Sequence, residues 1–239
     1  MISKNQIKLI RQLEQKKFRR REELFVAEGP KVVGDLLRAG YHPHMLFSTT
    51  DWPEAQMVTA DELRRISFLQ HPQGILAVFP TPPETSITSC LPTTGLYLAL
   101  DGVQDPGNLG TIIRIADWFG INTVFCSEDT VDAWNPKVVQ ATMGSIARIN
   151  LIYTDLARLF DATTLPLYGT LLDGENIYDE PLASEGIIVM GNEGNGISQP
   201  IREKITHRLL IPSFRKGNTA ESLNVAIATA IVCSEFRRR

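Results

Sequence analysis

The sequence predicts an α/β protein built from two domains. Short apolar runs alternate along the chain with segments whose apolar residues recur at helical spacing, which is typical of strands joined through helices. A stretch rich in Pro, Ser and Thr, residues 81–94, has the composition of a linker. We therefore predict a smaller α/β domain over residues 1–80 and a larger α/β domain over residues 95–239.

Length and composition favour a soluble protein of the cytoplasm. The chain has 239 residues, of which 43% are hydrophobic, enough to bury a full core. No apolar run approaches the ~20 residues of a membrane span, and the first residues lack the apolar segment of a signal peptide. Cys90, Cys126 and Cys233 lie far apart, without metal-ligand spacing, so we expect reduced buried thiols. The four histidines form no ligand set either, and no metal site is predicted.

The charge is unevenly distributed along the chain. The net charge is −3, but residues 1–31 carry nine Lys or Arg and four Glu, whereas the remainder carries 15 basic and 23 acidic residues. The densest part of this basic arm consists of Lys16, Lys17, Arg19, Arg20 and Arg21. Such a run is typical of a phosphate-binding surface, although a solvated helix face explains most runs of this kind. Phe18, inside the run, can stack on a base or pack into the core.

The first domain reads as three helices and three strands. Ile7, Ile10 and Leu13 recur at helical spacing in a helix that should stop before the charged run KKFRRREE. A strand over 24–27 is followed by Gly29 and Pro30, which open a helix closed by Gly40. The remaining elements are a strand over 45–48, a helix over 60–66 capped by Thr59, and a strand over 74–79.

The second domain begins with a strand, a polar loop and a helix. The strand covers 96–100, the loop is DGVQDPGNLG and the helix is TIIRIADWFG. Ligands of open α/β sheets bind beyond the carboxyl ends of the strands, so Asn108 and Arg114 are expected near a pocket. Arg114 is expected early in its helix, where the helix dipole disfavours a cation. This mismatch indicates function, whereas an ion pair with Asp117 is the structural alternative.

A second glycine-rich loop follows a later strand. After a strand over 123–126, a helix opened by Asn135 and Pro136, and less informative segments, a strand over 187–190 runs into GNEGNGIS. The glycines of this loop are spaced G-x-x-G-x-G, whereas the dinucleotide-binding fingerprint is G-x-G-x-x-G. The spacing weakens a dehydrogenase interpretation. Glycines allow close approach to a ligand, and a tight turn would use them as well.

The last predicted elements are a strand over 209–211, ended by Pro212, and a helix opened by Ser222 and Asn224. The helix is apolar on nearly every face, which predicts deep burial. A buried amide left unpaired costs about 1–3 kcal/mol, so Asn224 should have partners. Those partners are a bound substrate in the functional interpretation, and backbone N–H groups if Asn224 only caps the helix.

Three segments of the second domain resemble, in order, the three signatures of the SpoU class of RNA ribose methyltransferases. They are DGVQDPGNLGTIIRIADWFG, IVMGNEGNGIS and IPSFRKGNTAESLNVAIATAI. The segments KKFRRREELFVAEGPKVVGDLL and HPQGILAVF resemble the N-terminal substrate-binding domain of ribosomal-RNA enzymes of that class. The resemblance implies a C-terminal trefoil knot in a mostly parallel sheet. Periodicity alone predicts an unknotted chain.

The resemblance also implies an activity, S-adenosylmethionine-dependent methylation of a ribose 2′-hydroxyl in RNA, and assigns the site. The donor would lie against Gly191, Ile211 and Leu223. The target ribose would be surrounded by Asn108, Arg114, Glu193, Ser222 and Asn224. The basic arm would contact RNA, and two copies would pair through their knots, each site borrowing residues from its partner. We expect a homodimer with Ile227, Ala230 and Ile231 at the interface or in the core.

The role of Arg114 has two interpretations. The family comparison proposes it as the base, but a guanidinium has a pKa above ~12, so a role in holding phosphate and stabilising charge is preferred. The nine residues 213–221 make a loop longer than the family commonly has, which leaves the rim of the donor pocket undefined.

Other functions stay open alongside ribosomal-RNA methylation. They are transfer-RNA ribose methylation, a non-catalytic RNA-binding or assembly protein, and a nucleotide-dependent enzyme such as a dehydrogenase. Titration with S-adenosylmethionine and with NAD separates the last two from the first, because a bound ligand stabilises the fold.

Overall fold

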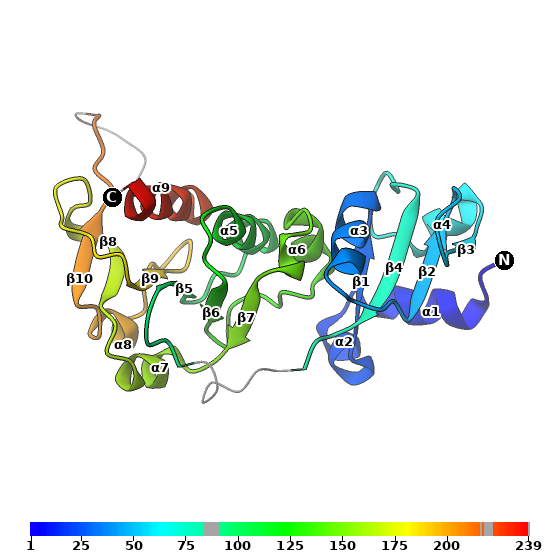
Figure 1. Cartoon of the computed structure of the whole chain (residues 1–239), viewed down its shortest axis with the longest axis horizontal. Helices are drawn as coiled ribbons and strands as arrows, with labels where there is room; N and C mark the ends of the chain where they lie inside the picture. Colours follow the sequence, from blue (N-terminus) through cyan, green and yellow to red (C-terminus); the bar gives the residue numbers. More distant parts are fainter. Residues whose placement is uncertain (84–90, 216, 218–221, 239) are drawn as a thin grey trace. The chain divides into compact units, whose positions relative to one another are not determined.

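Figure 1 shows the computed structural model of the chain, which describes residues 1–83, 91–215, 217 and 222–238. The contacts divide the chain into two compact units. Unit 1 consists of Met1–Pro83 together with Asp132–Arg148, and unit 2 holds the described residues of 84–131 and 149–239. The segment 132–148 lies within the range expected for the second domain, yet its contacts belong to unit 1. The domain boundaries themselves stay a prediction.

Unit 1 is a four-stranded sheet in the order β1-β4-β2-β3. The strands are β1 (Leu24–Glu28), β2 (Met45–Ser48), β3 (Gln56–Met57) and β4 (Ile75–Pro80). β4 is antiparallel to both β1 and β2. The helices are α1 (Lys4–Gln12), α2 (Lys16–Glu22), α3 (Pro30–Arg38) and α4 (Ala60–Ile66). The predicted strands and helices are thus confirmed, and α2 and β3 are additions.

Local sequence explains where the helices of unit 1 begin and end. Ser3 with Gln6, and Thr59 with Glu62, form capping boxes that start α1 and α4. Pro30 occupies the first turn of α3, where its missing N–H costs nothing. The first helix ends at Gln12, before the charged run KKFRRREE, as predicted. The run itself forms a separate helix, α2, because its residues have good helix propensity.

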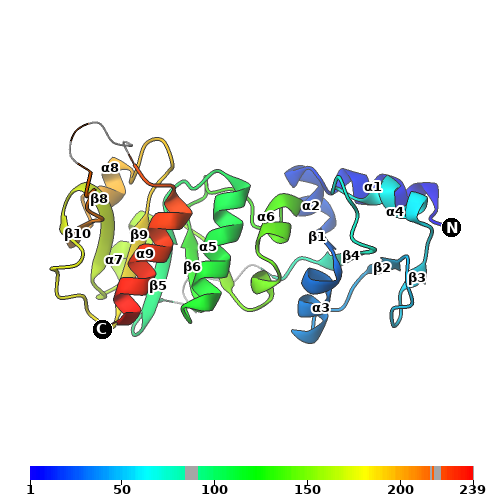
Figure 2. The same ribbon diagram turned by 90° about the horizontal axis from the view of Figure 1, so that it is seen from above.

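The sheet of unit 1 buries both faces. One face packs against α1 and α4 through Ile10, Leu13, Phe47, Leu63 and Ile66 (Figure 2). On the other face Phe25 stacks on Phe79 and lies 4.5 Å, centroid to centroid, from Trp134. Trp134 belongs to the segment 132–148, which contains α6 (Pro136–Ala141) and a short 3-10 helix, Ser145–Ala147. This segment therefore completes the core of unit 1.

Unit 2 is a six-stranded parallel sheet in the order β10-β8-β9-β5-β6-β7. The strands are β5 (Leu96–Leu100), β6 (Thr123–Cys126), β7 (Asn150–Tyr153), β8 (Leu167–Asn176), β9 (Gly186–Met190) and β10 (His207–Leu210). The central strands β5 and β9 are nearly continuous apolar runs, as expected for a parallel sheet covered on both sides. The mostly parallel α/β prediction is confirmed.

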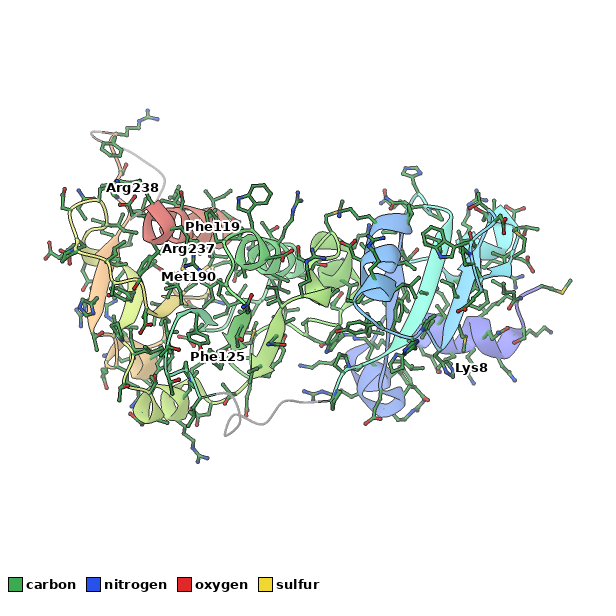
Figure 3. All side chains as sticks on the ribbon, viewed as in Figure 1. Lys8, Phe119, Phe125, Met190, Arg237 and Arg238 are labelled. Atoms are coloured by element: carbon green, nitrogen blue, oxygen red, sulfur yellow. The ribbon has the colours of Figure 1, made fainter. Side chains whose placement is uncertain are left out.

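Helices cover the two faces of this sheet. One face carries α7 (Leu156–Ala162) and α8 (Gln199–Arg202), which pack against Phe125, Ile187 and Val189. The other carries α5 (Pro106–Trp118) and α9 (Val225–Arg238), which lie side by side in both views (Figures 1 and 2). Arg237 near the end of α9 donates hydrogen bonds to the carbonyls of Phe119, at 2.8 Å, and Gly120, at 3.1 Å (Figure 3). These bonds satisfy carbonyls left unpaired at the end of α5.

Two helix predictions need correction. α5 begins at Pro106, capped by Asp105, so Arg114 lies in the middle of the helix and the dipole argument does not apply to it. α9 begins at Val225 rather than Ser222, and it is not deeply buried on all sides, because Ile227 is 54% exposed. The predicted knot involves the chain between β10 and α9, and residues 216 and 218–221 of that segment lie outside the described residues.

The two cysteines that the structure describes have the predicted state. Cys126 and Cys233 are free and buried, and burial raises the pKa of each thiol to about 12. Cys90 lies outside the described residues. Within the described ranges no group of His, Cys, Asp or Glu is arranged to hold a metal ion, and no helix is long and apolar enough to cross a membrane.

Candidate active site

The candidate site lies at the carboxyl ends of β5 and β9. These neighbouring strands are parallel and in register from Leu96–Gly186 to Leu100–Met190, so their following loops leave from one edge of the sheet. Hydrogen bonds join the loops where they leave the sheet. The N–H of Asp101 donates to the Met190 carbonyl at 2.9 Å, and Asn192 Nδ2 donates to the Gly102 carbonyl at 2.7 Å.

The loop after β9 is a tight turn organised by Asn192. The backbones of Asn192 and Gly196 exchange two hydrogen bonds of 2.9 Å, and Asn192 Oδ1 accepts from the N–H groups of Gly194 and Asn195. A Cβ on Gly191 would overlap the backbone of Gly196 and Ile197. Close backbone packing therefore explains the glycine at 191, and the turn presents Glu193 towards the neighbouring loop.

Glu193 binds the start of α5. Its carboxylate accepts hydrogen bonds from the N–H groups of Gln104, at 3.3 Å, and Asp105, at 3.2 Å, and from Asn108 Nδ2 at 3.0 Å. Partial burial alone would raise the pKa of Glu193, but these donors outweigh it and hold the pKa below its ordinary value. Glu193 is consequently ionised at neutral pH and a weak proton acceptor.

Asn224 connects α9 to the same group of side chains. Its Oδ1 accepts from the N–H groups of Ala226, at 3.0 Å, and Ile227, at 3.2 Å, which is an N-cap. Its Nδ2 donates to Asn108 Oδ1 at 2.9 Å. Asn224 therefore caps the helix, as the structural interpretation expected, and also contacts Asn108. Its contact with a substrate stays a prediction. It is exposed rather than buried, and the expected burial of its amide is wrong.

Asn108, Glu193 and Asn224 form one directional chain of hydrogen bonds, which we call the amide relay. Because backbone N–H groups fix Asn224 Oδ1 as an acceptor, Nδ2 must be its donor, and Asn108 must turn its oxygen to Asn224 and its NH₂ to Glu193. Each amide orientation is thus set by its neighbour. Side chains from three distant segments are held at one place.

Arg114 and Ser222 stand outside this relay. Arg114 is exposed and makes no hydrogen bond or salt bridge with any other described residue, so the ion pair with Asp117 is not formed. Six residues along an α-helix correspond to a rotation of about 240°, so Arg114 and Asn108 lie on different faces of α5. The side chain of Ser222 is exposed and, among the described residues, has no hydrogen-bond partner.

The three predicted donor-binding residues each lie next to the end of a strand or the start of a helix. Gly191 follows β9, Ile211 follows β10, and Leu223 precedes the cap of α9. Ile211 is half-buried and Leu223 is 50% exposed, so both side chains leave apolar surface accessible to a ligand. A purine ring with polar edges fits apolar side chains next to exposed loop backbone. The residues present therefore fit an adenosine-containing cofactor.

The predicted RNA-binding arm coincides with α2 and needs one correction. Lys16, Lys17, Arg20 and Arg21 are exposed, and Lys17 and Arg21 lie over the ring of Phe18 at 4.9 and 4.8 Å. Arg19 is only 3% exposed. Its guanidinium pairs with Asp132 at 2.5 Å and donates to the carbonyls of Leu13 and Glu14. A buried guanidinium with these bonds is not available to phosphate, so Arg19 is a structural residue.

Sequence reasoning missed several residues that build the site. Asn192 joins its own turn to Gly102, and Asp105 caps α5 by accepting from the N–H of Asn108 at 2.8 Å. The signal for Asp105 was present, because Asp followed by Pro is a common helix start. Asn192 had no comparable signal, since its partner lies 90 residues away.

Comparisons with known proteins find relatives over most of the chain. Residues 95–234 match the SpoU rRNA Methylase family, and residues 4–77 match the MRM3-like substrate binding domain. The chain is 34% identical to the 23S rRNA (guanosine(2553)-2'-O)-methyltransferase RlmP of Bacillus subtilis, over 98% of this chain and 97% of the relative. It is 32% identical to the 23S rRNA (guanosine-2'-O-)-methyltransferase RlmB of Neisseria meningitidis, over 75% of this chain and 74% of that protein.

Solved structures extend the likeness to the whole fold. An AdoMet-bound rRNA methyltransferase from Sinorhizobium meliloti superposes with a TM-score of 0.87 at 31% identity, over 100% of this chain and 97% of the other. A structure assigned to the TrmH family, from Porphyromonas gingivalis, gives 0.85 at 44% identity, over 100% and 99%. The family match, covering more than half of the chain, together with these relatives leads to one conclusion: the protein belongs to the SpoU rRNA methylase family.

Proposed function

We propose that the protein transfers a methyl group from S-adenosylmethionine to a ribose 2′-hydroxyl of ribosomal RNA. The observation that carries the proposal is the amide relay, in which Asn108, Glu193 and Asn224 meet at the carboxyl edge of a parallel sheet. Relatives that align over most of this chain are named as 23S rRNA 2′-O-methyltransferases, which favours ribosomal over transfer RNA. A ribosomal-RNA substrate fits a protein of the cytoplasm.

The domain division follows the same proposal. Residues 1–80 would bind RNA and residues 95–239 would carry the methyltransferase site, joined by the linker 81–94. The matched ranges 4–77 and 95–234 support it. Segment 132–148, which packs in unit 1, would then make the RNA-binding part depend on the methyltransferase part for a complete core.

Different residues of the chain would bind the methyl donor and position the ribose. The cofactor supplies an electrophilic methyl group on a sulfonium, and Gly191, Ile211 and Leu223 would hold it. Glu193 of the turn 192–196 orients Asn108 at the start of α5, and Asn224 at the start of α9 binds Asn108, so both amides would face the ribose in fixed orientations. Positioning matters here because an in-line displacement depends on alignment of the two reacting atoms.

Glu193 is not the group that accepts the proton of the 2′-hydroxyl. A carboxylate that accepts three hydrogen bonds and has a lowered pKa is a poor base, so Glu193 is a positioning residue that orients Asn108. Arg114 has exposed donors that suit a phosphate or a developing oxyanion. The hydroxyl proton would pass to phosphate or water, while Arg114 stabilises the negative charge and Ser222 contributes a hydroxyl at the rim.

The position of Arg114 also supports a homodimer with shared sites. Arg114 lies one helical turn from Trp118, which is 85% exposed, and Leu223 and Ile227 on the neighbouring segment are also exposed. Exposed large apolar side chains of this kind mark interaction surfaces. Pairing through α5 and α9 would cover them, with Ala230 and Ile231 at the rim, and would bring Arg114 to the relay of the second copy.

The experiment that tests the proposed activity uses the full chain, labelled S-adenosylmethionine and unmodified transcripts of ribosomal and transfer RNA. Methyl transfer to a ribose of the ribosomal transcript, lost in Asn108→Ala, is the expected result. Transfer to the transfer-RNA pool alone would reverse the choice of substrate. No transfer with donor binding intact would favour a non-catalytic RNA-binding protein.

Site sharing has a separate test. Arg114→Ala and Asn108→Ala are each expected to be inactive, but an equilibrated mixture should regain about a quarter of wild-type activity, because half of the dimers are mixed and one of their two sites is whole. A monomer by sedimentation, or no recovery on mixing, would exclude shared sites.

A further inference from the structure

A second basic cluster lies in unit 1, away from the arm on α2. Three cationic side chains converge on the carboxylate of Asp35. Lys31 Nζ lies 3.5 Å from Asp35 Oδ2, Arg148 Nη1 lies 3.3 Å from the same oxygen, and Arg38 pairs with Oδ1. Lys31 and Arg38 belong to α3, whereas Arg148 follows the 3-10 helix of segment 132–148. We call these four residues the Asp35 cluster.

The carboxylate is buried while the cations face solvent. The side chain of Asp35 is 8% exposed, whereas those of Lys31, Arg38 and Arg148 are 59%, 72% and 46% exposed. Burial alone would raise the pKa of Asp35, but hydrogen bonds from Arg38 and Arg148 and the charge of Lys31 hold it below its ordinary value. Asp35 is therefore a fixed anion beneath a group of exposed cations.

Two glycines make room for this arrangement. Gly144 has φ +94° and approaches Asp35 so closely that a Cβ would overlap its carboxylate. Gly34 lies beside the Arg38 guanidinium, where a Cβ would come within 3.1 Å of Nη1. Close packing therefore fixes the carboxylate of Asp35, and the glycine at 34 leaves room for the guanidinium of Arg38.

Stabilisation alone does not account for the cluster. One cation suffices to balance the charge of a carboxylate, and a cation that stays largely in water, like Lys31 or Arg38, contributes little to stability through its ion pair. Lys31 and Arg38 share this one anion, which introduces repulsion between the two cations. Lys31 also stands in the first turn of α3, where the helix dipole disfavours a positive charge. An anionic ligand would relieve both costs.

We infer that Lys31 and Arg38 form a binding site for backbone phosphate of RNA, held in position by Asp35. The inference rests on the proposed function, since it takes RNA as the source of the phosphate. Lys31 and Arg38 have Asp35 as their only ion-pair partner among the described residues, so their remaining donors are available. A guanidinium presents paired donors that match phosphate oxygens.

The test measures the affinity of the full-length protein for an unmodified transcript of large-subunit ribosomal RNA over a series of KCl concentrations. The variant Lys31→Gln with Arg38→Gln should weaken binding and reduce the log–log salt slope by about 1.4, because each single-strand phosphate that is neutralised by a cation adds roughly 0.7 to the slope. The matched control is Arg64→Gln with Arg65→Gln, which removes the same charge from exposed positions of α4 in the same unit. Its slope should stay at the wild-type value.

Two further measurements protect the result from a folding artefact. The charge-preserving exchange Lys31→Arg with Arg38→Lys should restore the slope, and all variants should keep the wild-type affinity for S-adenosylmethionine. Equal slope changes in the two double Gln variants, or none in either, would overturn the inference.

Free phosphate is distinguished from RNA by thermal unfolding in sodium phosphate and sodium chloride at matched ionic strength. Stabilisation by phosphate that requires Lys31 and Arg38, with an unchanged RNA slope, would overturn the assignment to RNA. A wild-type protein that binds the transcript with the expected slopes but transfers no methyl group would contradict the proposed function and leave the cluster supported.

Discussion

Helices α2 and α5 each carry an arginine that the sequence analysis predicted to be functional. In the structure the two arginines differ in their exposure and in their hydrogen-bond partners. Arg19 of α2 is 3% exposed and donates to Asp132 and to two backbone carbonyls. Arg114 of α5 is exposed and has no hydrogen-bond or ion-pair partner among the described residues. The residue type is the same, and only the use of its donors differs.

The difference separates a residue that supports the fold from one that can bind a ligand. Removing one partner of a buried pair leaves an uncompensated charge, which is costly. Removing an exposed arginine without partners changes stability little. The comparison therefore predicts opposite effects of mutation at the two positions.

The largest expected effect is on stability at Arg19. Arg19→Ala should lower the free energy of unfolding by about 3–5 kcal/mol, because Asp132 and the carbonyls of Leu13 and Glu14 lose their partner. Denaturant unfolding of the full chain measures it. Arg21→Ala, on the exposed side of the same helix, is the control and should stay within about 0.5 kcal/mol. Equal losses of stability in Arg19→Ala and Arg21→Ala would contradict a structural role for Arg19.

At Arg114 the expected effect is on rate. Arg114→Ala should slow methyl transfer about a hundredfold or more, as removal of a charge-stabilising donor does. Stability should stay within about 0.5 kcal/mol, and calorimetry should find the donor affinity unchanged. An Arg114→Ala protein with full activity would show that the exposed arginine has no part in the reaction.

A smaller effect is expected from Glu193, and it depends on pH. The lowered pKa means that its ionised form stabilises the fold above the ordinary pKa of a glutamate, and that this contribution is lost as the pH falls through the lowered value. Glu193→Gln should cost about 1 kcal/mol at neutral pH. Unfolding experiments should find this difference shrinking on acidification. A difference that grows towards acid pH would contradict the lowered pKa.

The smallest change concerns the exposed part of α2. Replacing Lys16, Lys17, Arg20 and Arg21 by Gln should reduce the log–log salt slope of RNA binding by about 2 if three of them bind phosphate, at roughly 0.7 for each phosphate. Donor affinity should not change. Unaltered RNA binding at low salt would show that these four residues form only a solvated helix face. In that case, adding Arg19→Gln to the variant should lower stability and leave RNA binding unchanged.

Local patterns were reliable where the local chain decides the structure. The helix over residues 60–66 starts at its predicted cap, Thr59, because the capping box is formed within four residues. The strands over 45–48, 96–100 and 123–126 have their predicted bounds, since apolar runs between turn residues have few other options. Gly40 and Gly120, both at positive φ, end their helices as expected.

Predictions failed where a distant partner decides the outcome. The burial of Arg19 depends on Asp132, 113 residues away, and the exposure of Ile227 depends on what covers α9. The start of α5 was misplaced because the loop glycines masked the Asp105-Pro106 helix start. The hydrogen bond between Asn108 and Asn224 joins residues 116 apart in the sequence, and hydrophobic periodicity does not predict contacts over that distance.

By itself, the sequence determined the alternation of strands and helices, the uneven charge, and, through its three ordered motifs, the family and the residue types of the site. Those properties follow from side-chain hydrophobicity, backbone preference and capping, which act over a few residues. The tertiary structure decided which polar groups meet. It placed Glu193 as an acceptor for α5, turned the amide of Asn224 towards Asn108, buried Arg19 and gathered three cations on Asp35. The physical reason is that a charged or polar group takes its role from the partners and the solvent around it, and those are assembled only when distant segments pack.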